Sequence, residues 1–169
     1  MAEAGIFKPE DKVELIKGRI VSMMPIGEWH WSTAARLQHL LARAYGDKAI
    51  VVAGGSVGLG PQSEPQPDIG VYRWKQDFYA SGIPEAADAL IVIEVSDTSR
   101  VYDLGTKHDL YAAHGVPEYW VVDGSRRCIH VFRDPTDGMF RESRIYQPGE
   151  SIPLPQAESA VLKVEAAWF

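Results

Sequence analysis

Two carboxylates beside predicted strand ends are the residues that could do chemistry. Asp68 comes directly before the apolar run IGVY, and Glu94 lies near the end of the apolar run ALIVIEV. If the two strands are antiparallel neighbours, both side chains converge at one edge of the sheet. Two neighbouring acids are costly unless a cation lies between them. Oxygen ligands of this kind suit Mg²⁺ or Mn²⁺, which can activate a water to attack a phosphodiester. A solvated strand end is the alternative interpretation of Glu94.

A lysine would complete such a site, because its ammonium can orient the attacking water and offset charge in the transition state. Ser96 stands two positions after Glu94, and Lys107 lies on the helix predicted after that strand. A crossover helix packs back over its own strand, so Lys107 could return to the same edge. The alternative is an exposed i,i+4 pair with Asp103, worth about 0.3–0.5 kcal/mol.

The elements that would position these residues are read from periodicity and from turn residues. Strand, helix and strand over residues 89–123 predict a right-handed crossover with parallel strands. The predicted elements are a hairpin at 13–24, a helix at 28–45, short strands at 49–54, 56–60 and 68–72, and a long connection at 73–89. They continue with a buried strand at 89–95, a helix at about 101–114, strands at 118–123, 128–133 and 139–146, and an exposed turn at 149–155.

Composition favours one globular domain over residues 1–169. The chain has 169 residues, of which 46% are hydrophobic, and this is enough for a real core. It contains no apolar run of the roughly 18–20 residues that a membrane span needs, and its N-terminus lacks a basic start followed by an apolar stretch. We therefore expect a cytoplasmic protein without a membrane partner. The single cysteine, Cys128, lies in an apolar strand and is expected to pack as a small hydrophobic residue.

The charge balance bears on nucleic-acid binding. A formal charge of −6 and a pI near 5.3 argue against a general nucleic-acid coat protein, although a local basic groove remains compatible with them. Two interpretations stay open for the C-terminal arginines, a solvated hairpin face or a phosphate track. These arginines are Arg126, Arg127, Arg133, Arg141 and Arg144.

Several motifs in order resemble a known family. The segments VELIKGRIVSMMPIGEWH, QPDIGVY and LIVIEVSDTSRVYDLGTKHDLYAAHGVPEYWVVD resemble the Uma-two putative restriction endonucleases, a group within the PD-(D/E)XK nuclease superfamily. The resemblance covers residues 2 to about 149 and leaves 150–169 as a C-terminal extension. It implies an α/β (α+β mixed) fold with a restriction-endonuclease-like core, a mixed sheet flanked by helices and additional antiparallel strands. It also implies an N-terminal helix, and Met1 would lie at the beginning of the last turn of that helix.

The resemblance also implies roles for particular residues. Asp68 and Glu94 would bind Mg²⁺ or Mn²⁺ with the backbone carbonyl of Val95, and Lys107 would be the catalytic lysine. The supporting residues would be Glu14, as a further metal or water contact, His30, which could approach the phosphate, and Asp103 and Tyr111, which would support Lys107 or touch substrate. For Glu14 a half-exposed strand acid is the alternative, and for His30 structural packing between Trp29 and Trp31. Glu118, Tyr119, Trp120 and Asp123 match family positions and are interpreted as packing and turn residues.

Three functions follow as hypotheses. The first is a divalent-metal-dependent endonuclease that hydrolyses DNA. The second is a catalytically inactive module that keeps the nuclease fold for homodimerisation or nucleic-acid binding, with the apolar tail AVLKVEAAWF packed against the body or against a second copy. The third is a metal hydrolase for a small phosphorylated substrate, which is disfavoured because GGSVGLG lacks the spacing of a phosphate-binding loop.

Overall fold

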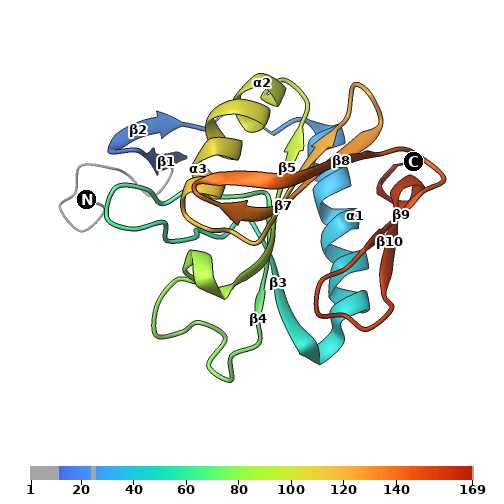
Figure 1. Ribbon diagram of the computed structural model, residues 1–169, viewed down its shortest axis with the longest axis horizontal. Coiled ribbons are helices and arrows are strands. Elements are labelled where there is room, and N and C mark those ends of the chain that lie inside the picture. Colours follow the sequence, from blue (N-terminus) through green and yellow to red (C-terminus); the bar gives the residue numbers. More distant parts are fainter. Residues whose placement is uncertain (1–11, 24–25, 169) are drawn as a thin grey trace.

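The computed structural model describes residues 12–23 and 26–168 (Figure 1). The helix expected around Met1 falls outside the described residues. Within the described part of the chain, no helix is long and apolar enough to cross a membrane.

A six-stranded mixed sheet forms the centre, in the order β3-β4-β5-β6-β7-β8. Its neighbouring strands are antiparallel except for β5 and β6, which are parallel. Every residue of β5 and β6 is buried, as expected for central strands covered on both faces. The strands are β3 (Ala49–Ala53), β4 (Ile69–Arg73), β5 (Ala89–Ser96), β6 (Glu118–Asp123), β7 (Cys128–Thr136) and β8 (Met139–Tyr146). The predicted mixed α/β class is confirmed.

One face of the sheet is covered by the crossover between β5 and β6. Its helical part comprises α2 (Arg100–Tyr102), the π-helical turn η3 (Asp103–Lys107) and α3 (His108–Ala113). The helix ends before Gly115, whose φ of 74° is the left-handed conformation that glycine adopts at no steric cost. Leu110 and Tyr111 pack there against Val92, Tyr119 and Val121 of the two parallel strands.

The opposite face is covered by α1 (Glu28–Tyr45), whose bounds agree with the predicted helix. Leu37 and Leu41 of α1 pack in one core cluster with Ile91, Ile93 and Trp120 of the sheet. The C-terminal segment joins this cluster and lies beside α1 (Figure 1). That segment comprises β9 (Ser151–Pro153), β10 (Val161–Lys163) and η4 (Val164–Ala167).

A separate hairpin precedes α1. Strands β1 (Val13–Ile16) and β2 (Arg19–Ser22) pair around Lys17 and Gly18, as predicted, and both turn residues have positive φ. The hairpin is fixed to the segment 62–66, because Glu64 N–H donates to Leu15 O at 2.8 Å and Gly18 N–H to Gln62 O at 2.7 Å. Two single turns complete the described elements, η1 (Gly46–Lys48) and η2 (Ala86–Asp88).

Two predicted elements are wrong. Residues 56–60 form no strand, because Val57 and Leu59 donate their N–H groups to Pro65 and Ser63 within a local loop, and Gly58 makes an isolated bridge. Residues 149–155 are no exposed turn, because β9 pairs with β10, and both Ile152 and Leu154 are buried in the core cluster that contains Leu37 and Leu41 of α1, here called the α1 core cluster.

Candidate active site

Asp68 and Glu94 lie side by side at one edge of the central sheet. Ile69 pairs with Ile93 across β4 and β5, so the antiparallel register places Asp68 next to Glu94. The backbone N–H of Val95 donates to Asp68 Oδ2 at 2.7 Å, which joins the two strand ends directly. The convergence predicted from the two apolar runs is therefore observed.

Lys107 returns from the crossover helix to the same edge. Its Nζ lies 2.9 Å from Glu94 Oε1 and 3.3 Å from Glu14 Oε2. Lys107, Glu94 and Glu14 are all buried, with exposures of 5%, 3% and 5%. Three alternative interpretations are therefore wrong. They are a solvated strand end for Glu94, a half-exposed acid for Glu14 and an exposed pair with Asp103 for Lys107.

A π-helical turn presents both ends of the segment Asp103–Lys107 to the interior. Asp103 and Lys107 are both buried, while Thr106 between them is exposed. A π turn inside an α-helix is rare and occurs frequently at functional sites. The local departure from α-helical geometry thus coincides with the residues that reach the sheet edge.

Tyr111 and Asp103 hold the neighbouring groups in place. The Tyr111 hydroxyl donates to Glu94 Oε1 at 3.0 Å, so this oxygen also accepts from Lys107. The hydroxyls of Ser96 and Ser99 donate to Asp103 Oδ2 at 2.5 and 2.6 Å. Ser96, the residue two positions after Glu94, therefore orients a second acid and is a contact that the sequence analysis missed.

His30 contacts the acid of the first strand. Its Nε2 lies 3.0 Å from Asp68 Oδ2, and its Nδ1 is buried without a hydrogen-bond partner among the described residues. Burial lowers the pKa of His30, but the hydrogen bond and charge of Asp68 outweigh burial and raise the pKa above 6.5. His30 is thus joined to the carboxylate cluster rather than packed only between tryptophans.

These side chains line one cleft of about 340 Å³. Among the described residues, the acids that line it are Glu14, Asp68, Glu94, Asp97 and Asp103, together with the single lysine Lys107. Tyr111 and Val95 support this lining from behind, through Glu94 and Asp68. The cleft therefore collects more negative than positive charge.

The pKa shifts follow from this imbalance. Desolvation raises the pKa of Glu94 well above its ordinary value, Lys107 opposes the shift, and Asp68 and Asp103 add to it. Burial lowers the pKa of Lys107, yet the charges of Glu94 and Glu14 outweigh it and raise the pKa, so the lysine stays charged. A further cation in the cleft would stabilise the ionised acids.

The donor set fits a hard divalent cation. Within residues 12–23 and 26–168, no hydrogen bond occupies Asp68 Oδ1, Glu94 Oε2 or Glu14 Oε1. Carboxylate oxygens are the ligands that Mg²⁺ and Mn²⁺ prefer. The residues present therefore suit the predicted ion, and the ligand role of the Val95 carbonyl stays a prediction.

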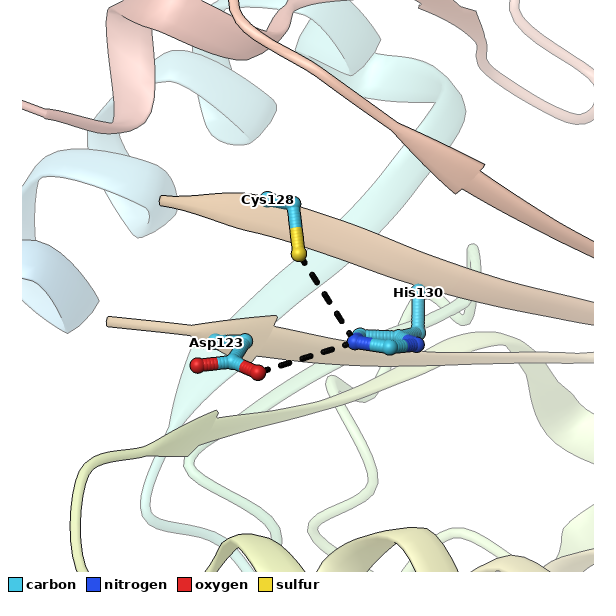
Figure 2. A group of neighbouring side chains, drawn as sticks. All are labelled: Asp123, Cys128 and His130. Atoms are coloured by element: carbon cyan, nitrogen blue, oxygen red, sulfur yellow. Dashed lines mark hydrogen bonds and ion pairs between the residues drawn. The ribbon is translucent and has the colours of Figure 1, made fainter. Parts of the chain in front are cut away.

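A second group of possible ligands lies at the β6–β7 turn. Asp123, Cys128 and His130 have donor atoms within 4.8 Å of one another, and Figure 2 shows the imidazole of His130 between the thiol and the carboxylate. However, Arg100 Nε donates to Asp123 Oδ2 at 2.6 Å, and Ser125 and Arg126 donate to Oδ1. Burial also raises the pKa of the Cys128 thiol. The Arg100 ion pair and the turn hydrogen bonds therefore satisfy Asp123 without a metal.

The comparisons with known proteins agree with this architecture. The family model described as "Putative restriction endonuclease", Uma2, matches residues 2–165. A crystal structure of a putative nuclease belonging to DUF820, from Anabaena variabilis ATCC 29413, is similar with a TM-score of 0.73 and 19% sequence identity, covering 98% of this chain and 94% of that chain. No curated protein matches the chain. At 19% identity the structural likeness shows the fold, whereas the family match spans almost the whole sequence. The chain therefore belongs to the Uma2 family of putative restriction endonucleases.

Proposed function

We propose that this protein is a divalent-metal-dependent endonuclease that hydrolyses DNA phosphodiester bonds. The observation that carries the proposal is the cleft in which Asp68, directly before β4, meets Glu94 of β5 and Lys107 of η3. Membership of the family supports nuclease activity. The burial and charge of this cleft support the assignment of these residues to its site.

Asp68, Glu94 and the Val95 carbonyl would hold Mg²⁺ or Mn²⁺, with Glu14 as a further contact. The bound cation would supply positive charge and lower the pKa of a water molecule. Its place in the cleft is favoured because Asp68, Glu94 and Glu14 each keep one oxygen free of hydrogen bonds within the described part of the chain.

The protein's own groups would orient the reactants. Lys107 would position the attacking water and offset the charge that develops on the phosphate. His30 and the Val95 N–H fix one oxygen of Asp68, and the Tyr111 hydroxyl fixes one oxygen of Glu94. Asp103 is held by Ser96 and Ser99. Its charge adds to those of Glu94 and Glu14, which raise the pKa of Lys107 and keep the lysine protonated.

Lys107→Met tests this assignment, because it removes the ammonium and keeps the length of the side chain. We expect Mn²⁺-dependent DNA cleavage to fall by about 10²–10³-fold, the usual cost of losing one group that stabilises transition-state charge. Calorimetric titration should show that Mn²⁺ binding is retained. The matched control is Lys48→Met, since Lys48 forms an exposed pair with Glu158. Unchanged cleavage by Lys107→Met would contradict the role of the lysine.

The same variant has a consequence for stability. Removing Lys107 leaves Glu94 and Glu14 buried without their shared ammonium, which costs about 3–5 kcal/mol in the metal-free protein. The cleavage assays therefore need Mn²⁺ and a temperature at which circular dichroism shows the variant to be folded.

A catalytically inactive module for dimerisation or nucleic-acid binding is the second candidate. It is favoured by the ion pair of Lys107 with Glu94 and Glu14, which compensates two acids without any metal. For dimerisation, β8 offers the edge of the sheet and exposes Met139 and Ile145. Absence of both metal binding and cleavage in the wild type would favour this candidate.

A further inference from the structure

The arginines of the β7–β8 region are neutralised by neighbouring acids. Arg133 lies 2.8 Å from Glu118, and Arg144 lies 2.6 Å from Glu150. Arg141 pairs with Asp137 at 2.9 Å. The solvated hairpin face, one of the two interpretations of these arginines, is therefore favoured over a phosphate track.

The β1–β2 hairpin carries a different set of cations. Lys12, Lys17 and Arg19 are all exposed. None of the ion pairs formed within the described part of the chain involves any of the three. In a protein with a formal charge of −6, a group of cations without an ion pair in the described part of the chain can attract an anionic partner.

The register of the hairpin places two of these cations beside the cleft. Glu14 pairs with Val21, and both residues line the cleft. Side chains alternate along a strand, so Lys12, two residues before Glu14, and Arg19, two residues before Val21, lie on the same face of the hairpin. Lys12 and Arg19 thus lie on the hairpin face that carries Glu14 and Val21, one on each side of that pair.

The spacing suits a nucleic-acid backbone. Arg19 pairs with Ile16, four residues from Lys12, so the two cations are separated by roughly 13 Å along the strand direction. This equals the rise of about four nucleotides in one strand of duplex DNA. Asp97 and Asp103 also line the cleft and would repel phosphate, so the hairpin cations are the groups beside the cleft that can attract it.

The hairpin is held in a fixed position relative to the acids. Lys17 N–H donates to Ser63 Oγ at 3.0 Å, and the bonds of Leu15 and Gly18 to segment 62–66 add to this attachment. Gln66 N–H donates to Glu14 Oε2 at 3.2 Å, which joins the same segment to the cleft. A backbone bound to the hairpin would therefore lie in a defined place relative to Asp68 and Glu94.

We infer that the β1–β2 hairpin is a clamp for the DNA backbone, in which Lys12 and Arg19 bind phosphates on either side of the Glu14–Val21 pair. The inference rests on the proposed function and adds the surface that holds the substrate. Within the described part of the chain, neither side chain forms an ion pair with the acids of the cleft, so their loss should weaken DNA binding and leave the metal site intact.

The test compares two double variants, Lys12→Gln with Arg19→Gln on the hairpin and Arg141→Gln with Arg144→Gln on β8. Binding of a short fluorescein-labelled DNA duplex is measured by anisotropy over a range of salt concentrations, with Ca²⁺ as a cation for the same oxygen ligands. Each phosphate contact contributes about 0.9 to the slope of log K against log salt, so the hairpin variant should lose about 1.8 from that slope. The β8 variant should keep the wild-type slope, and calorimetry should show the same Mn²⁺ affinity in all three proteins.

The outcomes separate the clamp from the proposed function. Equal DNA affinity and salt slope in the hairpin variant and the wild type, with cleavage intact, would overturn the clamp alone. The hairpin variant could bind DNA more weakly while Lys107→Met still cleaves at the wild-type rate. That combination would support the clamp and overturn the catalytic assignment. A wild type that neither binds nor cleaves DNA would overturn both.

Discussion

Asp68 of the cleft is held in place through one of its two carboxylate oxygens. Its Oδ2 accepts from the Val95 N–H at 2.7 Å and contacts His30 Nε2 at 3.0 Å. Two partners on one oxygen fix the plane of the carboxylate and leave Oδ1 for a cation. Neighbours that orient a metal ligand are as much a part of a metal site as the ligand itself.

His30→Gln tests this orientation. The glutamine amide reaches as far as the ring but lacks its rigidity, so it should loosen Asp68 and lower Mn²⁺ affinity by about 10–100-fold, the usual effect of losing a group that orients a ligand. Calorimetric titration measures the change directly. His39→Gln is the control, because His39 lies exposed on the same helix. Equal Mn²⁺ affinity in His30→Gln and in the wild type would show that His30 only packs.

The sequence predicted part of the site at this scale. The proximity of Asp68, Glu94 and Lys107 was predictable, because antiparallel pairing and a crossover fix where their backbones lie. The contacts of Ser96 with Asp103 and of Arg100 with Asp123 were not predictable, because they depend on side-chain directions across a helix and a sheet. The ion pair of Lys107 with Glu14 joins two elements that are far apart in sequence.

At the scale of elements, the crossover helix differs most from its expected form. Spacing of four residues places Asp103, Lys107 and Tyr111 on one face of an ideal α-helix. All three are buried, but the first interval is a π-helical turn. Periodicity in a sequence does not distinguish these two geometries, so the helix was predictable and its π turn was not.

Gly124 in the β6–β7 turn sets how closely that turn approaches α1. A Cβ at this position would lie 2.3 Å from Trp29, whose ring is stacked on Trp168. Gly124→Ala should therefore lower the free energy of unfolding by about 1–3 kcal/mol, the usual cost of overpacking. Urea denaturation measures the change.

Gly82→Ala is the matched control, since a Cβ there meets no atom within 4 Å and φ is not positive. It should leave stability unchanged or raise it slightly, because alanine restricts the unfolded chain. Equal stability of Gly124→Ala and Gly82→Ala would mean that Trp29 can move aside without cost.

Periodicity predicted long elements better than short ones. The bounds of α1 agree with the predicted 28–45, because the apolar stripe and Gly46 mark both its face and its end. The strand predicted at 56–60 and the turn predicted at 149–155 were wrong, because a few apolar residues beside glycine or proline fit a strand, a loop or a turn equally well.

At the scale of the whole molecule, the C-terminal segment belongs to the body of the same chain. Leu162, Val164 and Trp168 are buried in the α1 core cluster, and the Trp168 ring lies 6.0 Å from Trp29. Arg36 on α1 also donates to Ala166 O at 2.7 Å. Of the two sites considered for the apolar tail, its own body and a second copy, the structure shows the first.

Trp168→Ala should lower the free energy of unfolding by about 3–5 kcal/mol, because it removes a large buried ring between α1 and the C-terminal segment. Chemical denaturation measures the loss. Val161→Ala is the control, since Val161 is 47% exposed in the adjacent strand and should change stability by about 0.5 kcal/mol or less. A small effect of Trp168→Ala would contradict tight packing of the tail.

The central claim is that the acids of the cleft bind a divalent cation. Calorimetric titration of Mn²⁺ into the wild type and into Glu94→Gln tests it without any assumption about the substrate. We predict saturable binding to the wild type that disappears in Glu94→Gln, because the substitution removes one ligand charge and keeps the shape of the side chain. Saturable binding of equal affinity in both proteins, or no binding to the wild type, would contradict the account.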